Sequence, residues 1–221
     1  HGASKLRFMA HRHDPKGAPR LDQRRPAHER GEASTLLGRE VGTIRKSHAG
    51  RLRVALAFPN TYFVGMSNLG LQTVYALFNA DERVVCERVF LPPKSEIAAR
   101  LQRRDPLVTI ESQTPVRSFD VFAFSVSFEW DYPNVVTMLR LAGLEPRADR
   151  RHALDSLVVI GGAITFVNPE PLAPFADVIA AGEAELLVPS IVNAFADVGD
   201  RDRPALLERL AFETGCYVPG L

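Results

Sequence analysis

Apolar residues occur in short unbroken runs from residue 51 onward, and stretches with helical spacing separate these runs. A continuous apolar run without alternation is typical of a strand whose two faces are both buried in a parallel sheet. The run Val54–Phe58 predicts such a strand, and the β-branched and aromatic stretch Val84–Phe90 predicts a second one. Further strands are predicted at Asp120–Val126, Leu157–Ile160 and Asp177–Ala180, with a shorter candidate at Leu107–Ile110.

Helices are predicted between these strands. Ser67 is a candidate cap for a helix that carries Leu69, Thr73, Ala76 and Leu77 at helical spacing and ends at 79–81. Further helices are expected at Ser95–Arg104, at Val135–Leu141 with Pro133 in its first turn and Gly143 as its stop, at Glu183–Ala196 and at Pro204–Phe212. Three prolines in Asn168–Pro174 predict an extended loop there.

The alternation of strands and helices predicts an α/β fold with a doubly wound, mostly parallel five-stranded sheet of the flavodoxin or Rossmann type. Such sheets place their ligand crevice at the carboxyl ends of the strands. Those ends are predicted at Pro59–Ser67, Leu91–Lys94, Ser125–Asp131, Gly161–Pro169 and Ala181–Glu183. A binding surface is therefore expected along this edge.

Charge divides the chain into parts. Residues 1–50 contain 11 Lys and Arg against 5 Asp and Glu, whereas the remaining 171 residues contain 16 against 21. We expect a basic, partly unpacked arm over 1–50, an α/β domain over 51–198 and a helical linker over 199–221. Basic segments can neutralise nucleic-acid phosphates, but the arm lacks interleaved aromatic residues for base stacking, so a solvated or domain-docking arm is favoured.

Composition limits the other function classes. The chain has no 18-residue apolar run and no apolar signal segment near its start, and its two cysteines lie 130 positions apart. A cytoplasmic protein is the simplest interpretation. The histidines His1, His11 and His13 have irregular spacing and no neighbouring Cys or carboxylate cluster, so solvent exposure is favoured over metal binding.

Common catalytic motifs are absent from the sequence. Gly65 and Gly70 have the spacing of a P-loop, but Leu71-Gln72 replaces its Lys-Ser/Thr pair. No Gly-x-Gly-x-x-Gly, His-Glu-x-x-His or Gly-x-Ser-x-Gly motif occurs. His152 is the only histidine after residue 50 and lies in a polar stretch, which argues against Ser-His-Asp or Cys-His catalysis.

Several stretches together resemble the N-terminal cobalamin-binding-like domain of a group of uncharacterised radical SAM proteins. They are Phe58–Gln72, Glu111-Ser112, Phe119–Glu129, Gly161-Gly162, Asn168–Pro171 and Gly182–Glu185. The resemblance covers about residues 51–190. It implies an accessory domain that holds a corrinoid or the substrate at the carboxyl ends of the strands, and a radical SAM domain as its partner beyond Leu221.

The resemblance also supplies candidate site residues. In cobalamin-dependent relatives the first loop reads Asp-x-His-x-x-Gly, and its histidine ligates cobalt. Aligned on Gly65, this chain has Asn60 and Tyr62 at the two polar positions, so a corrinoid would be held without a histidine ligand. The remaining candidates for cofactor binding are Ser125, Ser127, Gly161, Gly162 and Glu183.

Catalysis by the chain alone is not expected. A radical SAM site needs Cys-x-x-x-Cys-x-x-Cys to hold a [4Fe–4S] cluster, and Cys86 and Cys216 do not supply it. The cluster and S-adenosylmethionine are expected in the downstream domain only. Two alternatives stay open: a cofactor-free structural or partner-docking domain whose crevice is filled by Tyr62, Phe63, Trp130 and Tyr132, and an RNA-associated module that uses the basic arm.

Overall fold

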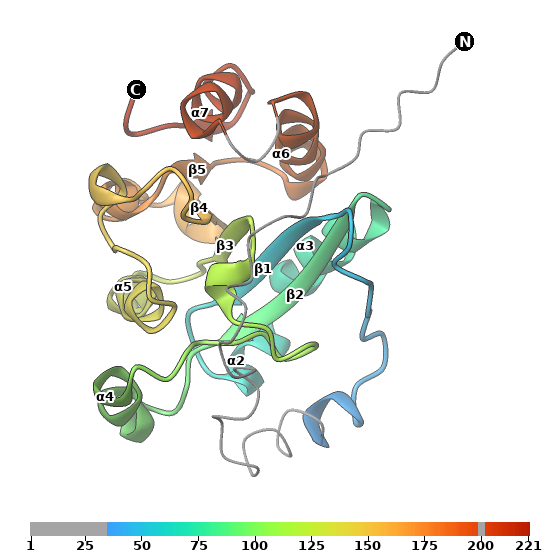
Figure 1. The fold of residues 1–221 in the computed structure, drawn as a ribbon, viewed down its shortest axis with the longest axis vertical. Helices are drawn as coiled ribbons and strands as arrows, with labels where there is room; N and C mark the ends of the chain where they lie inside the picture. Colours follow the sequence, from blue (N-terminus) through green and yellow to red (C-terminus); the bar gives the residue numbers. More distant parts are fainter. Residues whose placement is uncertain (1–34, 199–201) are drawn as a thin grey trace, which may run out of the picture.

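A six-stranded sheet with helices on both faces forms the centre of the protein, as the computed structural model of residues 35–198 and 202–221 shows (Figure 1). The strands follow the order β2-β1-β3-β4-β5-β6, and all neighbouring pairs are parallel except β5 with β6. Their bounds are β1 Leu52–Phe58, β2 Val84–Phe90, β3 Val121–Ser125, β4 Leu157–Gly161, β5 Val178–Ala180 and β6 Cys216–Tyr217. The predicted α/β, mostly parallel fold is confirmed, with one more strand than expected.

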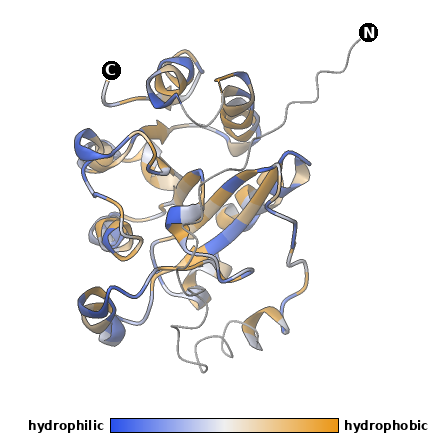
Figure 2. Ribbon diagram, in the orientation of Figure 1, coloured by the Kyte–Doolittle hydropathy of each residue, from blue (hydrophilic) through white to orange (hydrophobic). Residues whose placement is uncertain are grey.

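Two apolar cores separate the sheet from its helices. One face carries Leu56 and Val121 against α3, α6 and α7, and the other carries Phe122 and Val158 against α5 and the segment that follows α4. The helices are α2 Tyr62–Met66, α3 Leu69–Ala80, α4 Lys94–Arg103, α5 Tyr132–Leu141, α6 Ala184–Val198 and α7 Arg203–Ala211. Burial of each such large apolar side chain contributes about 1.5–3 kcal/mol, so both layers stabilise the sheet. Figure 2 shows most of the sheet as hydrophobic, with a hydrophilic stretch on β2 where Glu87 and Arg88 lie.

The cap of α3 differs from the prediction. Asn68, not Ser67, precedes the helix, and its side-chain oxygen accepts a hydrogen bond from the Leu71 N–H at 2.9 Å. Ser67 instead donates to the Val64 carbonyl, because residues 62–66 form the short helix α2 that the sequence analysis did not predict. Pro133 and Gly143 occupy the predicted positions at the start and just past the end of α5, and Gly143 has φ +72°.

Two irregular segments also differ from their predictions. Leu107–Ile110 is not a strand, because only Val108 forms an isolated bridge, with Pro115. The proline-rich segment predicted as an extended loop contains a 3-10 helix at Glu170–Phe175. Proline fixes φ near the helical value, and the Leu172 and Ala176 N–H groups still find carbonyl partners within the segment.

The C-terminal segment adds to the domain beyond a helix. Leu206 and Leu210 of α7 are buried in the same core as α6, and β6 pairs antiparallel with β5. Gly215, with φ +85°, makes the turn that lets its carbonyl accept from the Ala181 N–H at 2.7 Å. The strand β6 is absent from the prediction, since a two-residue strand leaves no detectable pattern in the sequence.

The described part of the predicted arm packs on the edge strand β2 and on α3. The Ile44 N–H donates to the Tyr75 hydroxyl at 2.9 Å, and the Lys46 ammonium donates to the Asn79 carbonyl at 2.7 Å. We call residues 36–48 the strap. Residues 1–34, with His1, His11 and His13 and with the basic pair Arg24-Arg25, lie outside the described residues. The solvent exposure expected for these histidines therefore stays a prediction, and the RNA-associated arm stays an alternative.

Candidate functional site at the carboxyl edge of the sheet

The turn after β4 requires glycine at one position. Gly162 has φ +101°, and a Cβ atom placed on it would lie 2.6 Å from the Val126 carbonyl oxygen. The two strands meet here because the Val126 N–H donates to the Gly161 carbonyl at 2.8 Å and the Ile164 N–H donates to the Val126 carbonyl at 3.1 Å. Gly162 therefore has a structural reason to be glycine, and its backbone is also exposed at the surface.

Three of the predicted site residues line one hollow. Ser125, Gly161 and Gly162 surround it together with Gly182, and its volume is about 70 Å³. Apolar side chains from the sheet, α3 and α6 form its walls, among them Leu56, Phe78, Ala123, Ala180, Leu187 and Ile191. Sites for whole small molecules have volumes of about 300–1,000 Å³, so this hollow accepts only a small apolar group.

Large apolar side chains are exposed around this edge. They follow the carboxyl ends of β1, β3, β4 and β5 and are Phe63, Val64, Leu69, Phe128, Trp130, Phe166, Val167 and Leu186. Trp130 is 89% exposed and Phe63 is 76% exposed. We call this set the apolar rim. Large apolar side chains that are exposed at one edge of a fold are candidates for an interaction site.

Asn60 faces inward and joins two loops. Its amide donates to the Asp131 carboxylate at 3.1 Å, and the Asn134 amide donates to the same oxygen at 3.2 Å. Burial raises the pKa of Asp131, and the two amide hydrogen bonds oppose this shift. The loops after β1 and β3 are thereby held together. Asp131 and Asn134 are members of the site that the sequence analysis missed, although Asp131 ends a loop that it had singled out.

Tyr62 also faces away from the hollow. Its hydroxyl donates to the Glu40 carboxylate of the strap at 2.5 Å, and its ring packs edge-on against Phe90. Burial and the Glu40 carboxylate raise the pKa of Tyr62 to about 12. Gly65 lies below this ring pair, where a Cβ atom would meet the Phe90 ring at 2.4 Å. Both residues therefore have packing roles at the β2 side of the edge.

The last two predicted residues lie apart from the hollow. The Ser127 hydroxyl accepts from the Asn68 amide at 3.1 Å, which links the start of α3 to the loop after β3. Glu183 is exposed, and its backbone carbonyl accepts from the Leu186 and Leu187 N–H groups at the start of α6. The structure thus gathers Ser125, Gly161 and Gly162 and distributes the other predicted residues around them.

The family of N-terminal domains of radical SAM proteins matches residues 70–219 of this chain, which is more than half of its length. The chain belongs to this family. No curated protein shows significant similarity to it. The match accounts for the predicted relationship to radical SAM proteins, and it leaves the ligand of the domain unassigned.

The cysteines of this radical SAM N-terminal domain are not arranged for a cluster. Cys86 is buried in β2, where burial raises the pKa of its thiol well above the usual value, and burial raises the pKa of Cys216 to about 11. Among the described residues, no three His, Cys, Asp or Glu side chains gather in a way that could hold a metal ion. The family instead implies S-adenosylmethionine and the [4Fe–4S] cluster for another part of a radical SAM protein.

A corrinoid fits this edge only in part. The Tyr62 hydroxyl donates a hydrogen bond to Glu40 and points away from the hollow, so this phenol is not placed as a cobalt ligand. The exposed glycines and the hollow leave backbone accessible to a ligand, as a contact held without a bond to cobalt would require.

None of the helices in the described ranges is long and apolar enough to cross a membrane.

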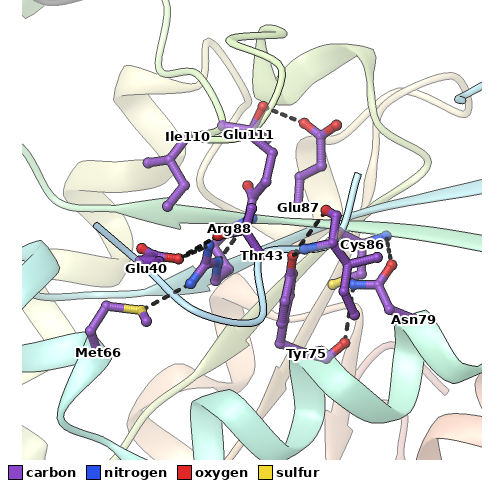
Figure 3. A network of polar contacts seen from close by, with 12 residues as sticks. Glu40, Thr43, Met66, Tyr75, Asn79, Cys86, Glu87, Arg88, Ile110 and Glu111 are labelled. Carbon is purple, nitrogen blue, oxygen red and sulfur yellow. Dashed lines mark hydrogen bonds and ion pairs between the residues drawn. The ribbon is translucent and has the colours of Figure 1, made fainter. Parts of the chain in front are cut away.

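Charged side chains are gathered at a second place in the domain, along β2 (Figure 3). The Arg88 guanidinium donates to Glu111 at 2.6 Å and to Glu40 of the strap at 2.6 Å, and it lies 4.6 Å from the centre of the Tyr75 ring. It also contacts the Met66 sulfur at 3.1 Å. Burial raises the pKa of Glu111 to about 7, against the opposing charge of Arg88.

The neighbouring Glu87 points to the other face of β2 and has its own partners. It contacts the His48 ring at 2.7 Å and accepts hydrogen bonds from the Thr109 and Ser112 hydroxyls at 2.6 and 2.5 Å. Burial alone would raise the pKa of Glu87, but these contacts outweigh it and hold the pKa below its usual value. Arg88 and Glu87 of β2 are both paired with side chains inside the domain, so we assign them a structural role.

Proposed function

We propose that this chain is the accessory binding domain of a radical SAM enzyme and that the carboxyl edge of its sheet faces the radical SAM domain of the same protein. The edge holds a ligand between the two domains, either a corrinoid without a protein ligand to cobalt or the substrate. One observation carries this proposal: the strand ends that supply the exposed side chains of the apolar rim also supply the glycines of the hollow.

The hollow and the rim have different parts in this function. The hollow accepts a small apolar group, because its walls are apolar and its volume is about 70 Å³. The body of a larger ligand lies on the exposed backbone at Gly162 and Gly182, between rim residues such as Trp130 and Phe166. Aromatic side chains at such positions supply contact area with little loss of conformational freedom.

Titration of the purified chain with hydroxocobalamin tests the corrinoid form of the proposal. We expect retained absorbance after removal of free cofactor, with a spectrum that lacks imidazole-ligated cobalt. Gly162→Ala should lower the amount of retained corrinoid, because the added Cβ distorts the turn after β4. Gly143→Ala is the matched control, since Gly143 also has a positive φ but has open space around it. No retention at high micromolar cofactor would reject the corrinoid and leave the substrate as the ligand.

A cofactor-free docking domain is the second candidate, because the apolar rim by itself suits a protein partner. The four aromatic residues expected to fill the crevice in this case do not line the hollow; they are Tyr62, Phe63, Trp130 and Tyr132. The affinity of this chain for the separately expressed radical SAM domain distinguishes docking alone from ligand binding between the two domains. Equal affinity with and without added corrinoid or substrate would favour docking alone.

A further inference from the structure

A cavity of about 350 Å³ lies between the carboxyl ends of α4 and α5, which are neighbours on one face of the sheet (Figure 1). Its walls come from the last turn of α4 and the chain just after it, from the 3-10 helix at Val116–Ser118 that precedes β3, and from residues 140–143 at the end of α5. Its volume falls in the range of small-molecule sites. No residue of the apolar rim or of the hollow lines it, so the function proposed above leaves it unused.

Positive charge dominates the lining of this cavity. A single carboxylate, that of Asp105, lines it together with four arginines, which are Arg100, Arg104, Arg117 and Arg140. Asp105 is already neutralised by an arginine outside the lining, because its carboxylate pairs with the Arg103 guanidinium at 2.7 Å. The lining therefore carries an excess of positive charge.

Two of the lining arginines have no counter-charge within the fold. The side chains of Arg104 and Arg140 are exposed, and neither forms a hydrogen bond or an ion pair with any residue in the described ranges. Arg100 differs, since its side chain is only 9% exposed and its guanidinium donates to the Glu96 carboxylate at 2.8 Å. Unpaired guanidinium groups in the wall of a cavity attract anions, because each brings five N–H donors and a charge that persists at every physiological pH.

The backbone at Arg104 has a conformation that helix ends usually assign to glycine. Arg104 directly follows α4 with φ +55° and ψ +38°, in the left-handed region. An arginine there is strained relative to glycine, and its side chain makes no contact with a described residue that would offset the strain. A basic residue near a helix carboxyl end also favours the helix dipole, but Arg100 and Arg103 already supply two such charges to α4. The Arg104 side chain is thus better explained by a ligand than by the fold.

We propose that this cavity binds the phosphate group of a small phosphorylated molecule. Arg104 and Arg140 bind the phosphate oxygens, because the planar guanidinium fork matches phosphate geometry. A phosphate monoester carries about −1.5 to −2 charges at pH 7, so it balances the charge of the lining better than a carboxylate does. The organic part of the molecule packs on Pro106 and on Leu101, an apolar residue that is 38% exposed. The volume of the cavity favours a small molecule over a nucleic-acid strand.

Calorimetric titration of this chain with phenyl phosphate and with benzoate tests the proposal. The two probes share an aromatic ring and differ in the anionic group, so we expect saturable binding of phenyl phosphate, about tenfold or more tighter than that of benzoate. Arg140→Gln should weaken the binding of phenyl phosphate about tenfold, which corresponds to about 1.4 kcal/mol. Arg150→Gln is the matched control, because it removes the same charge from an exposed arginine outside the lining and should leave binding unchanged.

Arg104→Gly separates binding from folding. Glycine removes the guanidinium and adopts the left-handed conformation without strain, so the thermal unfolding temperature should equal or exceed that of the unchanged chain while phenyl phosphate binds about tenfold more weakly.

Three outcomes overturn the proposal. The first is the absence of saturable phenyl phosphate binding or equal affinity for benzoate, and the second is unchanged binding in both Arg104→Gly and Arg140→Gln. The third is tighter binding of a single-stranded RNA oligonucleotide that is lost in the same two variants, which would assign these arginines to a nucleic acid. None of these results depends on corrinoid retention at the carboxyl edge of the sheet.

Discussion

The outer edge of β2 and the carboxyl edge of the sheet distribute polarity in opposite ways. At β2 the charged side chains Arg88 and Glu111 are buried, whereas at the carboxyl edge the aromatic side chains of Phe63 and Trp130 are exposed. Every β2 charge has short-range partners, while the rim residues project into solvent. Residue type alone therefore does not indicate a functional site here. The better indicator is whether a side chain already has its partners inside the folded domain.

Removal of the Arg88 charge should give the largest effect. Arg88→Met leaves the Glu111 and Glu40 carboxylates buried without their counter-charge, which costs about 3–5 kcal/mol of the free energy of unfolding. Urea denaturation measures this loss. Arg83→Met, which breaks the exposed pair with Asp81, is the matched control and should cost less than about 1 kcal/mol. Equal losses in the two variants would mean that the β2 pairs are not structural.

Gly162→Ala should have the next largest effect, because it strains the carboxyl edge itself. The substitution combines a positive φ with an approach of 2.6 Å to the Val126 oxygen, and we expect a loss of about 3 kcal/mol. Gly143→Ala has a similar φ but no atom within 4 Å of the added Cβ, so about 1 kcal/mol is expected. Thermal unfolding of both variants checks the difference. A smaller loss in Gly162→Ala than in Gly143→Ala would contradict the close packing at β4.

The apolar rim should show little effect on stability and a clear effect on association. Trp130→Ser with Phe63→Ser should change the free energy of unfolding by no more than about 0.5 kcal/mol each, since both side chains are exposed. Loss of an aromatic anchor typically costs about 2 kcal/mol or more in binding, so affinity for the radical SAM domain should fall about thirtyfold. Unchanged affinity in the double variant would exclude these two residues from the interface.

The pH dependence at Glu87 should give the smallest effect. Because its pKa in the folded state lies below the usual value of 4.5, the folded state favours the ionised form. The resulting stabilisation is fully present above the unfolded pKa and is lost as pH falls through the folded pKa. The free energy of unfolding, measured at successive acidic pH values, should therefore fall less steeply with falling pH for Glu87→Gln than for the unchanged chain. The same pH dependence of the free energy of unfolding in both proteins would show that Glu87 does not contribute to the acid sensitivity.

The regular part of the fold could be predicted because its signal is local. The five parallel strands are mostly apolar, with β2 interrupted only by the pair Glu87 and Arg88, and the limits of α5 follow from Pro133 and Gly143. The strand β6 and the helix α2 could not be predicted, since both are short and depend on contacts with distant residues. The 3-10 helix at Glu170–Phe175 departs from the predicted loop because proline removes an N–H donor but still fixes φ near the helical value.

The candidate site could be predicted only by position along the chain. Ser125, Gly161 and Gly162 meet because their strands are neighbours in a parallel sheet, which follows from the fold class. The inward direction of Asn60 and Tyr62 depends on Asp131 and Glu40, which lie 71 and 22 residues away. No periodicity in the sequence connects such pairs, so the orientation of these two side chains required the structure.

The free side of β2 has a consequence for how the protein is made. Its outward backbone groups already have partners: Asn79 takes both groups of Cys86, the Ile110 N–H donates to the Arg88 carbonyl, and Glu111 accepts the Arg88 N–H. A nascent strand from another chain on the same polysome thus finds no open hydrogen-bonding row to extend. The pairing at Cys86 and Arg88 thus protects this edge strand against strand addition by a second copy of the domain.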